Sequence, residues 1–192
     1  MPRLFAGLEI PPDIAERIGH LRRPFPAIRW VPETDLHITL RLFGDIDKRT
    51  AEDLIQYLAN IEEPMFTLQI AGLKTRGSKD PHAIWAEVSP DPALIRLQAA
   101  CERAARNAGL KPESRGYKPH VTLARLGRIN PDYLARIMNR RSGFDTAPFP
   151  VPRFVLYSAK PHTGGGPYLV EETFPLLGGS WDDDDDDFDR VS

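Results

Sequence analysis

Two short segments of the sequence pair a histidine with a threonine two residues further on. Residues 37–40 read His-Ile-Thr-Leu and residues 120–123 read His-Val-Thr-Leu. In a β-strand, successive side chains point to opposite faces, so His37 and Thr39 would share one face, and His120 and Thr122 would do the same. Two such strands brought face to face would surround a small anion with two proton-transfer groups and two hydroxyl donors. A phosphodiester, attacked on one side and protonated on the other, fits this arrangement.

Two units of similar plan position these segments. The first has a strand at residues 4–10, a helix that continues to about residue 23 and a strand at residues 36–43, and the second has a strand at residues 83–88, a helix at residues 93–108 and a strand at residues 120–126. Helices lie between pairs of strands and do not follow every strand, which favours an α+β fold over a doubly wound parallel sheet. A pseudo-twofold relation between the two β-α-β units would bring both histidines to a central cleft.

Further elements extend both units. The sequence predicts helices at residues 50–60 and 131–140, and strands at residues 65–71, 153–159 and 168–174. We therefore expect residues 1 to 180 to form one domain with two lobes, in which duplicated β-α-β units supply two antiparallel sheets that line the cleft.

The composition is that of a globular protein. The chain has 192 residues, 41% of them hydrophobic, and a single cysteine, which excludes an intramolecular disulfide. No apolar run approaches the roughly 20 residues that span a bilayer, so we expect no membrane association. The first residues lack the basic, apolar and small-residue succession of a signal peptide, which favours the cytoplasm.

The acidic residues are concentrated at the C-terminus. Residues 181–192 contain seven acidic residues and one basic residue, and residues 1–180 then hold 24 Lys and Arg against 20 Asp and Glu, a net charge of +4. Because like charges repel, we expect this tail to be disordered and solvated. The mildly basic remainder is compatible with a polyanionic ligand held at one local site.

Residues 29–44 and 118–126 closely resemble the two signature motifs of the 2H phosphoesterases. Within that family they are similar to the RNA 2′,3′-cyclic phosphodiesterases, also called 2′-5′ RNA ligase-like proteins, and residues 3–10 and 154–158 add to the resemblance. A single His-x-Thr arises easily by chance. Two copies, each followed by a leucine and an arginine within a duplicated plan, form a specific signal.

The resemblance implies a bilobal α+β fold that opens the terminal 2′,3′-cyclic phosphate of RNA to a 2′-phosphomonoester. His120 would act as proton acceptor for the attacking water and His37 as proton donor to the departing 3′-oxygen. Thr39 and Thr122 would donate hydrogen bonds to the two non-bridging oxygens. The expected partner is RNA with a 2′,3′-cyclic phosphate end, or a small cyclic nucleotide, bound by a monomer without a cofactor.

Four more side chains are candidates for substrate binding. Arg41 shares the strand face of the first histidine by parity, whereas Arg125 has the opposite parity to the second histidine. A bulge or the end of the strand could redirect Arg125, and the family pattern favours its position near the phosphate. Trp30 and Tyr157 could stack on a base of single-stranded RNA.

Other functions remain open from the residues alone. Two histidines could be metal ligands, but no His, Cys or carboxylate lies at i+2 or i+4 of either strand, so we expect no metal. The same four residues would serve a phosphodiesterase acting on small cyclic nucleotides or on 2′-5′ linkages, or 2′-5′ RNA ligation in the reverse direction. The chain could also be a non-catalytic nucleotide- or RNA-binding module. Turnover of 2′,3′-cyclic AMP in the presence of a chelator distinguishes a metal-independent enzyme from such a module.

Overall fold

The strands that carry the two histidines are neighbours in an antiparallel sheet of eight strands. The computed structural model describes residues 3–77, 79–160 and 165–179. Its strands are β1 (Arg3–Glu9), β2 (Ile28–Trp30), β3 (His37–Asp45), β4 (Phe66–Leu68), β5 (Ile70–Arg76), β6 (Ala83–Val88), β7 (His120–Leu126), β8 (Phe149–Val151), β9 (Arg153–Ala159) and β10 (Leu169–Pro175). Its helices are α1 (Pro12–Gly19), α2 (Lys48–Ala59), α3 (Pro92–Asn107) and α4 (Pro131–Asn139), with a 3₁₀ turn η1 (Glu33–Asp35).

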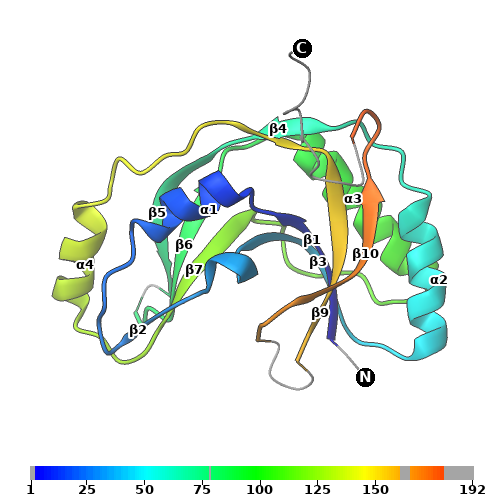
Figure 1. The fold of residues 1–192 in the computed structure, drawn as a ribbon. Coiled ribbons are helices and arrows are strands. Elements are labelled where there is room, and N and C mark those ends of the chain that lie inside the picture. Colours follow the sequence, from blue (N-terminus) through cyan, green and yellow to red (C-terminus); the bar gives the residue numbers. More distant parts are fainter. Residues whose placement is uncertain (1–2, 78, 161–164, 180–192) are drawn as a thin grey trace, which may run out of the picture.

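The large sheet has two lobes that meet at its centre. Its strand order is β10-β9-β1-β3-β7-β6-β5, and β2 also pairs with β7. Strands β3 and β7 are joined through one residue pair, Ile38 with Val121. The two expected antiparallel sheets are therefore the lobes of one continuous sheet, and Figure 1 shows them bent into an arch. Strands β4 and β8 form a separate two-stranded sheet. The prediction of an α+β fold is confirmed.

Matching strand registers make the internal duplication explicit. Glu9 of β1 pairs with His37, and Glu87 of β6 pairs with His120. Both ladders also shift register by one residue at the same place, immediately after the threonine of the motif. The two histidine strands are thus held by equivalent neighbours, β1 in one lobe and β6 in the other.

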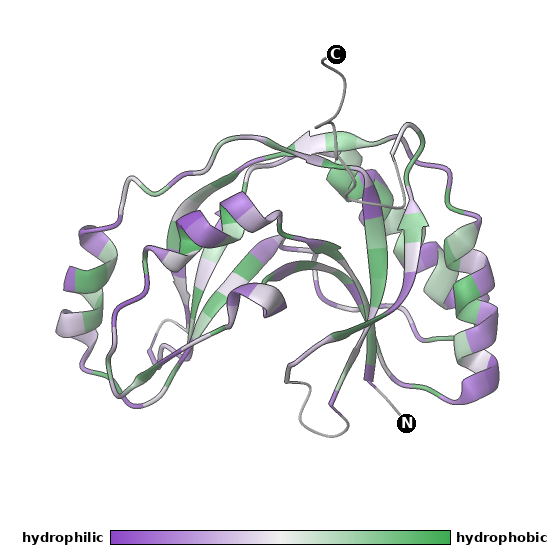
Figure 2. Cartoon of the chain, viewed as in Figure 1, coloured by the Kyte–Doolittle hydropathy of each residue, from purple (hydrophilic) through white to green (hydrophobic). Residues whose placement is uncertain are grey.

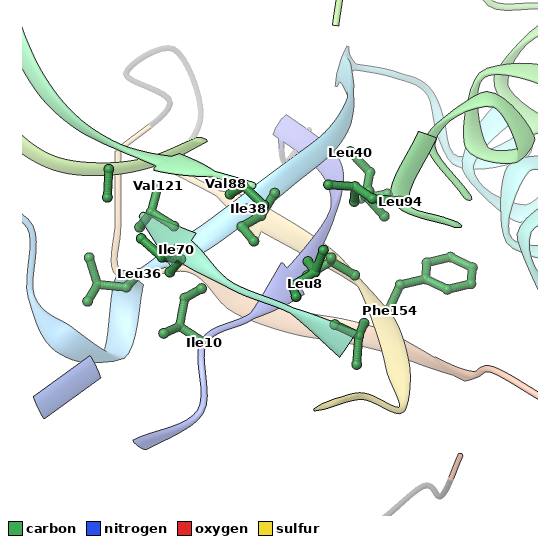
Figure 3. Packing of buried hydrophobic residues seen from close by; sticks show 14 of the residues in the cluster. Leu8, Ile10, Leu36, Ile38, Leu40, Ile70, Val88, Leu94, Val121 and Phe154 are labelled. Carbon is green, nitrogen blue, oxygen red and sulfur yellow. The ribbon is translucent and has the colours of Figure 1, made fainter. Parts of the chain in front are cut away.

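Most buried apolar side chains, from both lobes, form one core, and Phe5, Val155, Tyr157 and Ala159 form a second, smaller cluster. Figure 3 shows part of the core, with Val121 of β7 beside Ile70 of β5, and Leu40 of β3 beside Leu94 of α3. The helices carry apolar and polar residues on different faces, as their colours in Figure 2 indicate, because each must bury one stripe against the sheet. This core packs against one face of β3 and β7, and the two histidines lie on the opposite face.

The helices begin where the sequence provides caps. The carboxylate of Asp91 accepts hydrogen bonds from the backbone N–H groups of Ala93 and Leu94, and a proline occupies the first turn of α3. The side-chain oxygen of Asn130 caps α4 in the same way. Capping residues followed by proline are strong start signals, which is why α3 and α4 were predictable within one or two residues.

Several short elements differ from the expectations. The three-residue strands β2, β4 and β8 carry little periodicity of their own and exist through their partners, so the sequence did not predict β2 or β8. Helix α1 ends at Gly19, four residues earlier than expected, because the chain continues as tight turns. Strand β5 continues to Arg76, five residues beyond the end of the strand predicted at residues 65–71. The acidic run lies outside the described residues.

Candidate active site

The residue pair that joins the lobes also brings the two motifs together. Ile38 and Val121 are directly paired and fully buried. When the antiparallel register is continued by one residue on either side, each histidine lies across from the threonine of the other strand, on the face opposite to the buried pair. The four side chains so gathered are His37, Thr39, His120 and Thr122, each of intermediate burial. The structure thus brings both predicted His-x-Thr pairs onto one face.

Both imidazole rings are held by the same hydrogen bond. Nδ1 of His37 lies 2.8 Å from the carbonyl oxygen of Asp35, and Nδ1 of His120 lies 2.7 Å from that of Lys118. A carbonyl oxygen only accepts hydrogen bonds, so Nδ1 carries a proton and donates it in each ring. The remaining nitrogen, Nε2, is left for proton exchange with a ligand.

Three aromatic rings surround His37. Phe5 lies 4.8 Å and Tyr157 5.9 Å from its ring, measured between ring centroids. Tyr168 meets the imidazole edge-on at 4.9 Å and 82°. Nothing in the sequence singled out Tyr168, because it is remote from both motifs and is brought in by the start of β10. These rings exclude water from one side of the imidazole.

A single large ring packs against His120. Trp85 of β6 stacks on this imidazole with a centroid separation of 3.5 Å and an angle of 15°. The guanidinium of Arg76 lies 5.2 Å from the centroid of the same indole. The sequence analysis named neither Trp85 nor Arg76 as a site residue. The duplication could have pointed to Trp85, because it pairs with Thr122 in one lobe as Gly7 pairs with Thr39 in the other.

Burial sets the direction of both histidine pKa values. Removal from water lowers the pKa of His37, while the carbonyl and carboxylate of Asp35 counteract this and the positive charges of His120 and Arg125 add to it. Burial also lowers the pKa of His120, the Lys118 carbonyl opposes this, and the guanidiniums of Arg76 and Arg125 lower it further. The carboxylate of Asp35 thus acts on His37, whereas the charged groups that act on His120 are both guanidiniums.

A β-bulge reverses the expected positions of the two arginines. The register shift after each threonine inserts one extra residue, Leu40 in β3 and Leu123 in β7, so the parity of the next two residues changes in each strand. Arg125 consequently turns to the histidine face, where its charge acts on both imidazoles and on Tyr168. The prediction for Arg125 near the site agrees with this position.

The prediction that Arg41 shares the histidine face is wrong. After the bulge its side chain is buried on the core side, where Nε donates to the carboxylate of Glu102 in α3. Its other nitrogens donate to the carbonyl oxygens of Leu42 and, at 2.7 Å, of Lys111. Arg41 is a structural cation that ties β3 to α3.

The two aromatic residues predicted to stack on RNA bases, Tyr157 and Trp30, lie on opposite faces of the sheet. Tyr157 is 8% exposed and stacks on Phe5 with centroids 5.0 Å apart, next to His37. Trp30 pairs with Ala124, a buried residue of β7, and therefore faces away from the histidines. Its indole N–H donates to the carbonyl oxygen of Arg23 at 2.9 Å. Trp30 is therefore not beside the two histidines, and its expected stacking on an RNA base stays a prediction that could apply only away from them.

The loop before β10 fits closely against the first motif. The backbone N–H of Tyr168 donates to Asp35 Oδ1 at 3.3 Å. A Cβ atom added to Gly166 would lie 2.1 Å from Asp35 Oδ2, so with any other residue here the carboxylate or the loop would have to shift. The same carboxylate that acts on the pKa of His37 thereby anchors the aromatic ring beside it.

Within the part of the chain that the structure describes, no group of three or more His, Cys, Asp or Glu side chains could hold a metal ion. No helix among the same residues is long and apolar enough to cross a membrane.

Two lobes that each contribute a His-x-Thr strand to one face define a phosphoesterase of the 2H class. The comparison with protein families agrees: a model described as the 2′-5′ RNA ligase superfamily matches residues 10–162. The chain belongs to this superfamily, and the resemblance seen in the sequence is confirmed.

Similar proteins carry one name. The chain is 29% identical over 163 residues to an RNA 2′,3′-cyclic phosphodiesterase of Geobacillus stearothermophilus, which covers 83% of this chain and 51% of that protein. It is 32% identical over 130 residues to the Bacillus subtilis protein of the same name, covering 65% of this chain and 71% of that protein. The chain thus spans about half the length of the first relative and more of the second.

Solved structures share the whole fold. The crystal structure of Escherichia coli LigT in its apo form superposes with a TM-score of 0.73 at 25% identity, covering 91% of this chain and 97% of that one. LigT has also been crystallised with 3′-AMP, at a TM-score of 0.71 and 26% identity over the same shares of the two chains.

Proposed function

We propose that this protein hydrolyses the terminal 2′,3′-cyclic phosphate of RNA to a 2′-phosphomonoester by acid–base catalysis with two histidines. The observation that carries the proposal is the pairing of Ile38 with Val121, which supports a joint site for both His-x-Thr pairs. In-line displacement at phosphorus needs a base on one side and an acid on the other, and two imidazoles with free Nε2 atoms supply both. The names of the relatives support the same reaction.

The surroundings of the two rings support a division of roles. The carboxylate of Asp35 favours a proton on His37, whereas the charged groups that act on His120 are the guanidiniums of Arg76 and Arg125, which disfavour one. His37 is then the acid that protonates the departing 3′-oxygen. His120 is the base that takes a proton from the attacking water. Both imidazoles return to their starting protonation states as the product leaves.

The phosphate needs stabilisation as charge develops on its oxygens. The hydroxyls of Thr39 and Thr122 lie on the histidine face and donate to the two non-bridging oxygens. Arg125, whose charge acts on both histidines, supplies the positive charge. With water activated by an imidazole and the anion held by these groups, the mechanism requires no metal ion. Crystals of LigT with 3′-AMP and with phosphate support a phosphate site in this fold.

The test is turnover of an RNA that ends in a 2′,3′-cyclic phosphate, with the product analysed for the position of its phosphate. The wild-type protein should release only the 2′-phosphomonoester. Replacing His37 or His120 by Ala should lower turnover at least about 100-fold, the lower end of what a positioned acid or base contributes. Near wild-type turnover in either variant, or a 3′-phosphate product, would show that the proposed mechanism is wrong. Binding of the RNA without turnover by the wild type would favour a non-catalytic module.

A further inference from the structure

A cavity lies behind β2, away from both histidines of the motifs. It has a volume of about 820 Å³ and lies between the turn that follows α1, strand β2 and helix α4. Figure 1 shows α4 at one end of the arch, beside the segment that leads from α1 to β2. We name it the α4 groove, and the lining residues that matter here are Arg23, Phe25, Trp30, Tyr133, Arg136 and Arg140.

The α4 groove carries uncompensated positive charge. Four arginines line it: Arg23, Arg136, Arg140 and Arg141. Among the described residues, none of the four forms an ion pair with a carboxylate. Arg141 is fixed by donating to the carbonyl oxygens of Ile137 and Leu21 at 3.0 and 3.1 Å. An adjoining cavity of about 400 Å³ shares Arg140 and Arg141 with the groove. Such a site selects an anion.

Aromatic rings lie between these charges. Phe25 and Tyr133 stack with centroids 4.6 Å apart at 23°, and Tyr133 is 36% exposed, so the outer face of its ring is open. Trp30 adds a third ring to the lining. Guanidinium groups gathered around aromatic rings, one of which is exposed, suit the phosphates and bases of single-stranded nucleic acid. An acidic peptide would use the charges but would leave the rings without a partner.

Strand β2 connects the groove to the active site. Arg29 pairs with Arg125, so these two side chains share the histidine face, while Ile28 and Trp30 on either side of Arg29 point into the groove. A strand of RNA could therefore pass from Arg125 over Arg29 and around the edge of β2 into the groove. We infer that the α4 groove binds the single-stranded body of an RNA whose end lies at the two histidines. This inference rests on the proposed function for the direction of the RNA.

The experiment compares a groove variant with a charge-matched control. Arg136→Gln with Arg140→Gln removes two exposed charges from the groove, and Arg49→Gln with Arg106→Gln removes two exposed charges from α2 and α3. Binding is measured by fluorescence anisotropy with a labelled single-stranded RNA of about 12 nucleotides that ends in a 3′-phosphate. The groove variant should bind at least about 10-fold more weakly, and its log–log salt dependence should fall by about 0.7 for each lost phosphate contact. The control should bind as the wild type does.

A second variant tests the rings. Tyr133→Leu keeps an apolar side chain on α4 but removes the stacking face, and it should weaken binding of the same RNA about 10-fold. Equal affinity of wild type, both groove variants and the control would overturn the inference, as would equal weakening by the groove and control variants. Weakening by the arginine changes but not by Tyr133→Leu would show a site for anions in general, which also contradicts an RNA-binding groove.

Turnover separates this inference from the proposed function. For an RNA of the same length with a 2′,3′-cyclic phosphate, the groove variant should show a KM raised about 10-fold, while 2′,3′-cyclic AMP is hydrolysed at the wild-type rate. Turnover of both substrates unaffected by the groove variant would leave the proposed function intact and the inference wrong. Absence of turnover by the wild type would contradict the proposed function, and the anisotropy series would still decide whether the groove binds RNA.

Discussion

At the scale of single residues, the two histidines are alike in their hydrogen bonds and unlike in their neighbours. Each donates from Nδ1 to the carbonyl of the residue two positions earlier, and each has a pKa lowered by burial. They differ in charge and in packing, since His37 has Asp35 and three rings nearby and His120 has arginines and one indole. The difference between the environments, more than the motif itself, assigns a role to each ring.

Burial of the histidines predicts a loss of stability in acid. Because the pKa of each histidine is lower in the folded than in the unfolded chain, the folded state binds protons less readily. The stability that these rings contribute is present above the ordinary pKa of about 6.5 and is lost as the pH falls through the lowered values.

His37→Asn isolates the contribution of one ring, because an asparagine amide can still donate to the Asp35 carbonyl but does not titrate. The melting temperature of the wild type should fall more steeply below pH of about 6.5 than that of the variant. Parallel curves of melting temperature against pH for the two proteins would mean that folding does not lower the pKa of His37.

At the scale of the elements, a bulge in each histidine strand decides which arginine serves the site. Arg125 and Leu42 occupy equivalent places after the bulges, as do Ala124 and Arg41. The lobe of β7 therefore places Arg125 on the histidine face, whereas the lobe of β3 places Arg41 on the core side, where it pairs with Glu102. This asymmetry within a duplicated fold could not be predicted by parity, because parity assumes a regular strand.

The two arginines should give opposite phenotypes. Arg41→Ala removes the cation beside the largely buried Glu102, which keeps only the hydrogen bond from the backbone N–H of Glu113, and should lower the free energy of unfolding by about 3 kcal/mol, with little effect on turnover by the folded protein. Arg125→Ala should lower kcat/KM about 100-fold and change stability by less than about 0.5 kcal/mol. Denaturant unfolding and steady-state kinetics on both variants check this, and the reverse assignment of effects would refute the bulge argument.

The loop before β10 provides a second prediction at this scale. In Gly166→Ala the new Cβ would overlap Asp35 Oδ2, so the carboxylate or the loop must shift, which should loosen the contact that holds Tyr168 beside His37. Greater exposure of His37 to water should raise its pKa towards the ordinary value. Titration of the imidazole signals by NMR measures this directly.

Gly143→Ala is the matched control, because a Cβ at Gly143 meets no atom within 4 Å. It should leave the titration of His37 unchanged. An unchanged His37 titration in Gly166→Ala as well would mean that Tyr168 does not shield the ring.

At the scale of the whole molecule, the sequence predicted what depends on repetition and failed where an element depends on its partners. The two motifs, the β-α-β duplication and the α+β fold follow from periodicity and caps in residues 3–126. The contacts of Trp85 and Tyr168 with the histidines depend on strand pairing between distant segments, which no local pattern encodes. The face on which Trp30 lies likewise depends on its register with β7.

The central claim is that one proton shared across His37 and His120 makes the protein active without a metal ion. It is tested most directly by kcat/KM for a 2′,3′-cyclic phosphate RNA as a function of pH, with a chelator present throughout, in the wild type and in both alanine variants. The wild-type profile should be bell-shaped with its maximum below pH of about 6.5, because both pKa values are lowered in the free protein. The residual activity of His120→Ala should lose the acidic limb, and that of His37→Ala should lose the alkaline limb. A profile that keeps both limbs in either variant, or activity that is abolished by the chelator and restored by a divalent metal, would contradict the account.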